Sequence, residues 1–322
     1  MRHLMRLILA GAIAALATGA LAQSYPTRPI RLFVSFPPGG AADLVARIIG
    51  QPLSLRLGQP VVVENRPGAN GTLAGDLVAK SVPDGHTLFL GPSALFAINP
   101  HLYPKMPLDP LKDLVPVASV VSNALVLAAN PTLAKDKDFR AFVAAARAAS
   151  PALFYASIGN GSEHHLAMEL LKQQAGIDLT HVPYKGGGPA AIGVIGGDVA
   201  AMFGGGSVYP MVQSGQLKGL AVSSAKRSVQ LPDLPAIAEV YPGYEVVLWQ
   251  GLFVPVGTPP AILERLRSEV GATRALPEVA ERLNAGGVGE PMVTTPDEFV
   301  ARIRSDHDAF GKVIKSIGVR VD

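Results

Sequence analysis

One stretch, residues 30–47, most constrains the fold, because its apolar pattern changes from the period of a strand to that of a helix across a glycine turn. Apolar residues alternate over residues 30–36, which predicts a buried β-strand. Two prolines end this strand, and Gly39 and Gly40 permit a tight turn. A helical pattern follows, with Asp43 in its first turn. The pattern predicts a helix whose amino end leaves backbone N–H groups free to bind an anion.

The pattern of a short apolar run followed by a glycine-rich turn recurs along the chain. Further glycine-rich turns follow short apolar runs at residues 91–93, 158–162, 185–189 and 204–207. A single turn of this kind is often an ordinary connection between a strand and a helix, whereas the repetition favours a binding site. In an open α/β sheet the carboxyl ends of parallel strands meet at one edge, where ligands bind. We therefore predict an α/β protein with two domains and a ligand-binding cleft between their turn-bearing edges.

The length and the order of the predicted strands indicate a discontinuous first domain. About 300 residues is the size at which one hydrophobic core tends to split into two domains. We assign residues 23–122 and 224–322 to domain I and residues 123–223 to domain II, with crossings near Ser122 and at residues 219–223. Hydrophobic residues make up 48% of the chain but aromatic residues only 6%, so we expect a core of Ala, Val, Leu and Ile.

Residues 1–22 have the features of a secretory signal peptide. A basic segment with Arg2 and Arg6 precedes an apolar run at residues 7–17, and small residues form an A-x-A site that ends at Ala22. The apolar run is shorter than the roughly 20 residues that a membrane-spanning helix needs. We predict cleavage after Ala22 and a mature protein in the periplasm.

Composition argues against several classes of protein. The net charge of +3 falls to +1 without the two arginines of the predicted signal peptide, and no run of five Lys or Arg residues exists, so we expect no nucleic-acid partner. The absence of cysteine excludes disulfides, thiol catalysis and thiolate metal sites, and it suits the periplasm. We expect no metal, no cofactor and a monomer.

Hydroxyl residues mark several expected helix starts. Thr72, Ser162 and Thr258 each precede an apolar helical pattern and are expected to cap it. Thr295 and Glu298 have the spacing of a capping box.

Seven sequence motifs occur in an order that is typical of one protein family. In chain order they are Phe36-Pro-Pro-Gly-Gly with Asp43 and Arg47, Val63–Ala69, Pro83–Gly85, Gly159–Ser162 with His165, Val182–Gly188, Leu231–Asp233 and Trp249–Pro259. Together they cover the chain from Tyr25 to about Ile317. They resemble the substrate-binding proteins of tripartite tricarboxylate transporters, known as the TctC or Bug family.

The resemblance implies a type II periplasmic-binding-protein fold that closes by a hinge over a small carboxylate, without enzymatic activity. It also implies integral membrane transporter subunits as partners. The ligand-binding residues that it implies are Phe36, Gly39 and Gly40 from domain I, Ser93 from a third loop, and Ser157, Gly159, Asn160, Ser162, Tyr184, Lys185 and Gly186 from domain II.

Two residues depart from the family pattern. Ala42 stands where relatives often have a hydroxyl residue, and Gly204 stands where they often have a polar one. These departures concern the contacts that select the ligand rather than those that hold its carboxylate. Because few arginines are available, a mono- or dicarboxylate is favoured over a tricarboxylate, and the sequence does not identify the acid.

Each singled-out side chain also has a purely structural interpretation. Ser162 is a plausible helix cap, and His165 is expected to pack under the turn rather than to contact ligand. Lys185 is either a solvated charge or a cation that attracts anions. Trp249 is expected in the core or the hinge, and Asp43 at the helix dipole.

Two other functions stay open. Ser162, Glu163, His164 and His165 supply the residue types of a nucleophile and a base, as in an exported hydrolase that uses Ser162 and His165. No G-x-S-x-G elbow and no metal-binding histidine spacing accompany them. Alternatively, ligand binding serves a sensor kinase of a two-component system. Deleting the gene and assaying uptake and induction separately would distinguish transport from signalling.

Overall fold

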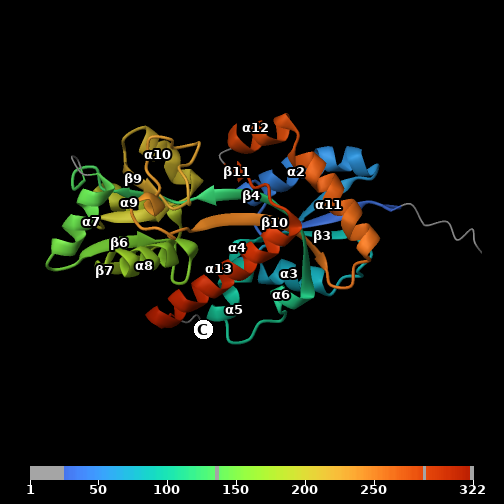
Figure 1. The fold of residues 1–322 in the computed structure, drawn as a ribbon, viewed down its shortest axis with the longest axis horizontal. Helices are drawn as coiled ribbons and strands as arrows, with labels where there is room; N and C mark the ends of the chain where they lie inside the picture. Colours follow the sequence, from blue (N-terminus) through green and yellow to red (C-terminus); the bar gives the residue numbers. More distant parts are fainter. Residues whose placement is uncertain (1–24, 135–137, 286–287, 320–322) are drawn as a thin grey trace, which may run out of the picture.

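A computed structural model describes residues 25–134, 138–285 and 288–319; the predicted signal peptide lies outside them. The chain forms two β-sheets, one with the strand order β11-β4-β10-β3-β1-β2 and one with the order β7-β6-β8-β5-β9. Figure 1 shows the six-stranded sheet with its helices on the right and the five-stranded sheet with its helices on the left. Among the described helices, none has the length and hydropathy required to span a bilayer.

The six-stranded sheet is covered on both faces. Ile30, Leu32 and Val34 pack in one core with α2, α11 and α12, whereas Phe33 packs in a second, aromatic core with Trp249 and Phe299. β1 runs parallel to β2 and β3, and β10 is antiparallel to β3 and β4. The elements are β1 Ile30–Val34, α2 Ala41–Leu57, β2 Val61–Asn65, η1 Ala69–Gly71, α3 Thr72–Ala79, β3 Thr87–Pro92, α4 Ser93–Ala97, α5 Asn99–Leu102, α6 Pro110–Asp113, β4 Leu114–Ala124, β10 Val247–Pro255, α11 Pro260–Arg274, α12 Pro277–Ala285 and β11 Glu290–Pro291.

The five-stranded sheet also lies between two layers of helices. Its core contains α7 and α8 residues on one face and α9 and α10 residues on the other. β6 runs parallel to β7 and β8, so the carboxyl ends of these three strands meet at one edge. The elements are β5 Val126–Ala129, α7 Phe139–Ala148, β6 Leu153–Ser157, α8 Glu163–Ala175, β7 Leu179–Pro183, α9 Gly187–Gly196, β8 Ala201–Gly204, η2 Gly206–Val208, α10 Tyr209–Gln213, β9 Lys218–Val222 and η3 Ile237–Glu239.

The chain passes from the six-stranded to the five-stranded sheet at Leu125, between β4 and β5. It re-enters the six-stranded sheet at Val247, the first residue of β10. The connecting residues 223–246 still contact the five-stranded sheet, since the N–H of Val222 in β9 donates to the carbonyl of Pro235. The last helix, α13 Pro296–Ile317, braces both units: Phe299 packs in the aromatic core of the first sheet and Phe310 in the core of the second (Figure 1).

Two of the four helix caps that the sequence predicts are present in the structure. Ser162 caps α8, and Thr295 forms a capping box with Glu298 at the start of α13, so both expectations are confirmed. The other two are wrong. Thr72 is the first residue of α3 because Gly71 occupies the cap position, and Thr258 donates to the carbonyl of Pro255 instead of capping α11.

Candidate ligand-binding site

The turn between β1 and α2, residues 36–40, is held by a buried carboxylate. Asp43 Oδ2 accepts the Gly39 N–H at 3.0 Å, and Asp43 Oδ1 accepts the side-chain amide of Asn65 at 3.1 Å. The Arg47 guanidinium bonds both oxygens of the same carboxylate. The hydrogen bond from Arg47 is the main cause that lowers the pKa of Asp43 to about 2, so the carboxylate is ionised at neutral pH.

The expectation that the glycines of this turn leave their N–H groups free is wrong. Gly39 donates to Asp43, and Gly40 donates to the carbonyl of Pro37 at 3.4 Å. The N–H groups of Ala41 and Ala42, which open α2, have no partner within the described part of the chain. The donors available to an anion therefore lie one to two residues further along than the sequence suggested.

A hollow of about 450 Å³ lies against this turn. It is lined by residues 36–42 together with Gln250 of β10. A Cβ on Gly39 would meet no atom within 4 Å, and Gly39 has a φ of +80°, which other residues rarely adopt. The buried Oε1 of Gln250 has no hydrogen-bond partner in the described structure. Three predicted site residues, Phe36, Gly39 and Gly40, thus share one hollow with an unpaired polar atom.

The turn between β6 and α8, residues 158–162, is held by hydroxyls and a histidine. Ser162 Oγ accepts the backbone N–H of His165 at 3.3 Å and donates to the carbonyl of Gly159 at 2.8 Å. The Gly161 N–H donates to Nδ1 of His165 at 3.1 Å, and Ser157 Oγ accepts the Gly159 N–H at 3.1 Å. The N–H groups of Asn160 and His164 have no partner within the described residues. This turn is therefore rigid and still offers donors.

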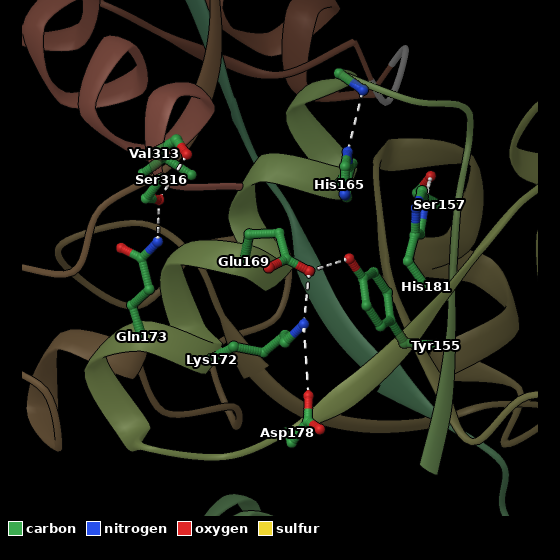
Figure 2. A network of polar contacts seen from close by, with 11 residues as sticks. Tyr155, Ser157, His165, Glu169, Lys172, Gln173, Asp178, His181, Val313 and Ser316 are labelled. Carbon is green, nitrogen blue, oxygen red and sulfur yellow. Dashed lines mark hydrogen bonds and ion pairs between the residues drawn. The ribbon is translucent and has the colours of Figure 1, made fainter. Parts of the chain in front are cut away.

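A stack of rings supports the turn from behind (Figure 2). The rings of His165 and His181 lie parallel, with centroids 3.9 Å apart, and Tyr155 stacks on His181 at 5.0 Å. Nε2 of His181 lies 2.6 Å from Oγ of Ser157. Burial, followed by repulsion from His181, lowers the pKa of His165 to about 4. His165 is therefore neutral at pH 7, as Nδ1 must be to accept the Gly161 N–H.

The far end of the stack is anchored on α8. The Tyr155 hydroxyl donates to Oε1 of Glu169 at 2.6 Å, and the Lys172 ammonium donates to the same oxygen at 2.9 Å (Figure 2). Because Glu169 is buried, this pairing satisfies a carboxylate that would otherwise be costly to enclose. The network joins the middle of α8 to Tyr155 of β6, the two elements that flank the turn.

The two neighbouring turns of the five-stranded sheet meet the first one. The Tyr184 N–H donates to the carbonyl of Ser157 at 3.0 Å, and Gly186, with a φ of +111°, precedes α9. A Cβ on Gly205 would lie 3.8 Å from Nε2 of His164. Lys185 is exposed and forms no ion pair with any described residue. The predicted residues of domain II are thus brought together at one sheet edge.

A side-chain hydrogen bond between Ser93 and Glu163 joins the two units beside the turn of residues 158–162. The Ser93 hydroxyl, at the start of α4, donates to Oε1 of Glu163 at 3.3 Å, and Ser93 Oγ accepts the N–H of Trp249 at 3.3 Å. Glu163 is the first residue of α8. Ser93, which the sequence analysis assigned to a ligand contact, therefore meets a carboxylate from the opposite unit.

The geometry speaks against the hydrolase alternative. The oxygen of Ser162 contacts the backbone of His165, while the ring nitrogen Nδ1 of His165 is occupied by Gly161. No imidazole lies within hydrogen-bond distance of Ser162 among the residues described, so the serine lacks a general base. No cluster of metal-ligating side chains was found in the described ranges.

Three side chains at the site were missed by sequence reasoning. Gln250 was quoted only as part of a motif, although it is a polar residue inside an otherwise apolar strand. His181 occupies a short strand without any local signal of its role. Glu163 was considered only as a companion of the supposed nucleophile.

Comparison with known proteins identifies close relatives of the whole chain. Residues 45–319 match the model of the tripartite tricarboxylate transporter family receptor. BugT of Bordetella pertussis is 37% identical over 313 residues, which cover 96% of this chain and 95% of that protein.

Two solved structures extend the comparison to the fold. An R. palustris protein solved with adipate is 33% identical, with a TM-score of 0.76 and coverage of 92% of this chain and 99% of that one. MatC from Rhodopseudomonas palustris, solved with bound malate, is 31% identical, with a TM-score of 0.71 and coverage of 90% and 100%. The expected two-domain α/β fold of type II periplasmic binding proteins is thereby confirmed. The chain belongs to the family of tripartite tricarboxylate transporter receptors, the TctC or Bug family.

Proposed function

We propose that this protein is a periplasmic solute-binding protein that captures a small carboxylate between its two α/β units. One observation carries the proposal. At the carboxyl edge of each sheet a glycine turn opens a helix, α2 or α8, with unpaired N–H groups at or beside its amino end. Hydrogen bonds from backbone N–H groups hold a carboxylate without requiring a charged side chain.

The ligand site combines the two turns. On the first side it comprises Phe36, Gly39 and Gly40, together with the free N–H groups of Ala41 and Ala42. On the second side it comprises Ser157, Gly159, Asn160, Ser162, Tyr184, Lys185 and Gly186. We expect a mono- or dicarboxylate ligand, and the malate and adipate bound in the two solved relatives, both dicarboxylates, support the second of these classes.

Binding closes a hinge between domain I, residues 23–122 and 224–322, and domain II, residues 123–223. Each domain holds half of the anion site, so a ligand that contacts both halves favours the closed state by its differential affinity. The closed protein delivers the ligand to the integral membrane subunits of a tripartite tricarboxylate transporter. This role is binding rather than catalysis, and it requires export to the periplasm with cleavage after Ala22.

Native mass spectrometry of the mature protein tests the proposal. The protein is measured before and after mild unfolding that strips bound ligand, and the stripped protein is then melted with a panel of small carboxylates. A ligand at 100 times its dissociation constant adds about 2.7 kcal/mol to the free energy of unfolding. A bound acid, or a carboxylate that raises the melting temperature, supports the proposal. If no acid is bound and no carboxylate of a broad panel shifts the melt, the proposal is wrong.

A further inference from the structure

We infer that Gln250 is a ligand-binding residue that helps to determine specificity, and that its side-chain amide donates a hydrogen bond to the ligand carboxylate at the amino end of α2. This inference rests on the proposed function, because it adds a residue to the same site and names the chemistry that the residue recognises. It follows from the direction in which β10 presents this side chain, from the lining of the hollow, and from the end of the amide that is accessible.

Gln250 lies on the face of β10 that points towards α2. Alternate residues of a strand share a face, and Leu252 and Val254, which share the face of Gln250, pack in the core that contains α2. Trp249 points the other way, into the aromatic core. Gln250 continues the α2 face beyond the core and reaches the hollow at residues 36–42.

Gln250 supplies the polar side chain of this hollow. Residues 36–42, which form the rest of its lining, are Phe, Pro, Gly and Ala, so none of their side chains carries a charge or forms a conventional hydrogen bond. The N–H groups of Ala41 and Ala42, which have no partner in the described part of the chain, are its backbone donors. On this side of the site, a side-chain hydrogen bond from the lining to a ligand therefore has to come from Gln250.

The amide of Gln250 presents its N–H end to the hollow. Oε1 is fully enclosed and has no hydrogen-bond partner among the described residues, whereas Nε2 is not enclosed and also makes no hydrogen bond to them. A carboxylate has about four acceptor positions on its two oxygens, so the N–H groups of Ala41 and Ala42 leave room for a further donor. Hydrogen bonds to an ionised carboxylate are stronger than those between neutral groups. The accessible N–H end therefore suits an anion and offers no acceptor to an ammonium group.

Calorimetric titration of two Gln250 variants tests the inference. The probes are lactate, succinate, malate, glutarate and adipate, each titrated into the mature wild-type protein and into both variants. Gln250→Met keeps the length of the side chain but removes its donor, so we expect the tightest-binding probe to bind about tenfold more weakly. Gln250→Glu keeps the shape but places a negative charge beside the probe carboxylate, so we expect a loss of at least about a hundredfold.

Two further variants are matched controls. Gln51 lies on the exposed surface of α2, roughly 15 Å along the helix from its amino end. Gln51→Met and Gln51→Glu make the same changes of side chain there and should leave the affinities unchanged. Melting curves without probe establish that each protein is folded. Where the first variant does not fold, Gln250→Ala replaces Gln250→Met and Gln250→Asp replaces Gln250→Glu.

The order of the affinities separates a ligand contact from a structural role. A structural role would weaken binding alike in the two Gln250 variants, whereas a contact with the carboxylate makes Gln250→Glu the weaker of the two. Unchanged affinity in Gln250→Met, or affinity in Gln250→Glu that equals or exceeds that of Gln250→Met, overturns the inference and leaves carboxylate capture standing. If none of the five probes binds, the tightest-binding carboxylate of the broad panel replaces them. If no carboxylate binds to the wild-type protein, the proposed function and the inference both fail.

Discussion

The two turns proposed to hold the ligand both offer backbone N–H groups at the start of a helix, but different side chains hold each turn in place. The turn of residues 36–40 is held by ionised groups, with the Asp43 carboxylate bonded to Gly39, Asn65 and Arg47. The turn of residues 158–162 is held by neutral hydroxyls and imidazoles. One turn therefore depends on a negative charge and the other on the absence of a positive charge.

Because of this difference, we expect the two turns to lose their supporting hydrogen bonds at different pH values. Asp43, with a pKa of about 2 against an ordinary 3.8, keeps its contacts until the pH falls through that window. His165, with a pKa of about 4 against an ordinary 6.5, is protonated far earlier on acidification, and protonation places a hydrogen on the nitrogen that accepts the Gly161 N–H. The second half of the site is therefore the acid-sensitive half.

Removing the carboxylate of the first turn should have the largest effect. Asp43→Ala leaves the Gly39 N–H, the Asn65 amide and the Arg47 guanidinium without their shared acceptor, so we expect a loss of about 3 kcal/mol in the free energy of unfolding. Arg47→Ala is the matched control, because its side chain is 54% exposed and an exposed ion pair contributes at most about 1 kcal/mol. Urea unfolding measures both; equal losses would show that Asp43 does not organise the turn.

Acidification should have the next largest effect, and it should act on the second turn. The folded state disfavours protonated His165, so its contribution to stability is fully present above pH 6.5 and is lost as the pH falls from 6.5 towards about 4. His165→Asn keeps a neutral acceptor for the Gly161 N–H, so its unfolding midpoint should depend less on pH over this range. The measurement is the urea midpoint of the wild-type protein and of His165→Asn at several pH values between 4 and 6.5. If the two midpoints change with pH in parallel, His165 does not cause the loss of stability in acid.

The smallest effect on stability, with a large effect on affinity, is expected for Gly39→Ala. A left-handed φ of +80° costs a non-glycine residue about 1 kcal/mol, and the new Cβ would stand in open space beside the hollow. Gly176→Ala is the matched control, because Gly176 ends α8 with a φ of +59° and also faces open space. Both should melt alike, but only Gly39→Ala should weaken carboxylate binding in calorimetry. Equal affinities would remove Gly39 from the site.

Sequence patterns that act over a few residues were enough to predict much of the fold. The alternation over residues 30–36, the Ser162 cap and the Thr295 capping box each act within a few residues, so the sequence pattern determines them. The caps at Thr72 and Thr258 failed because the adjacent Gly71 and Pro259 occupy the cap positions.

The contacts that distinguish the site could not be predicted in this way. Ser93 and Glu163 are 70 residues apart in sequence. His181 contacts Ser157 from the neighbouring strand, β7 beside β6. Such pairs depend on how the sheets are arranged, which a single sequence does not reveal. The bond from Gly39 to Asp43 spans only four residues, and an acidic residue in the first helical turn was its available signal.

Hydrogen exchange with and without ligand tests the central claim most directly, namely that one carboxylate engages both turns. The mature protein is measured alone and with the tightest-binding carboxylate of the panel, and protection is compared for residues 36–44 and residues 158–166. We predict that ligand slows exchange in both segments, because each supplies donors that otherwise have no partner. Protection of only one segment at saturating ligand would contradict a site shared by the two turns.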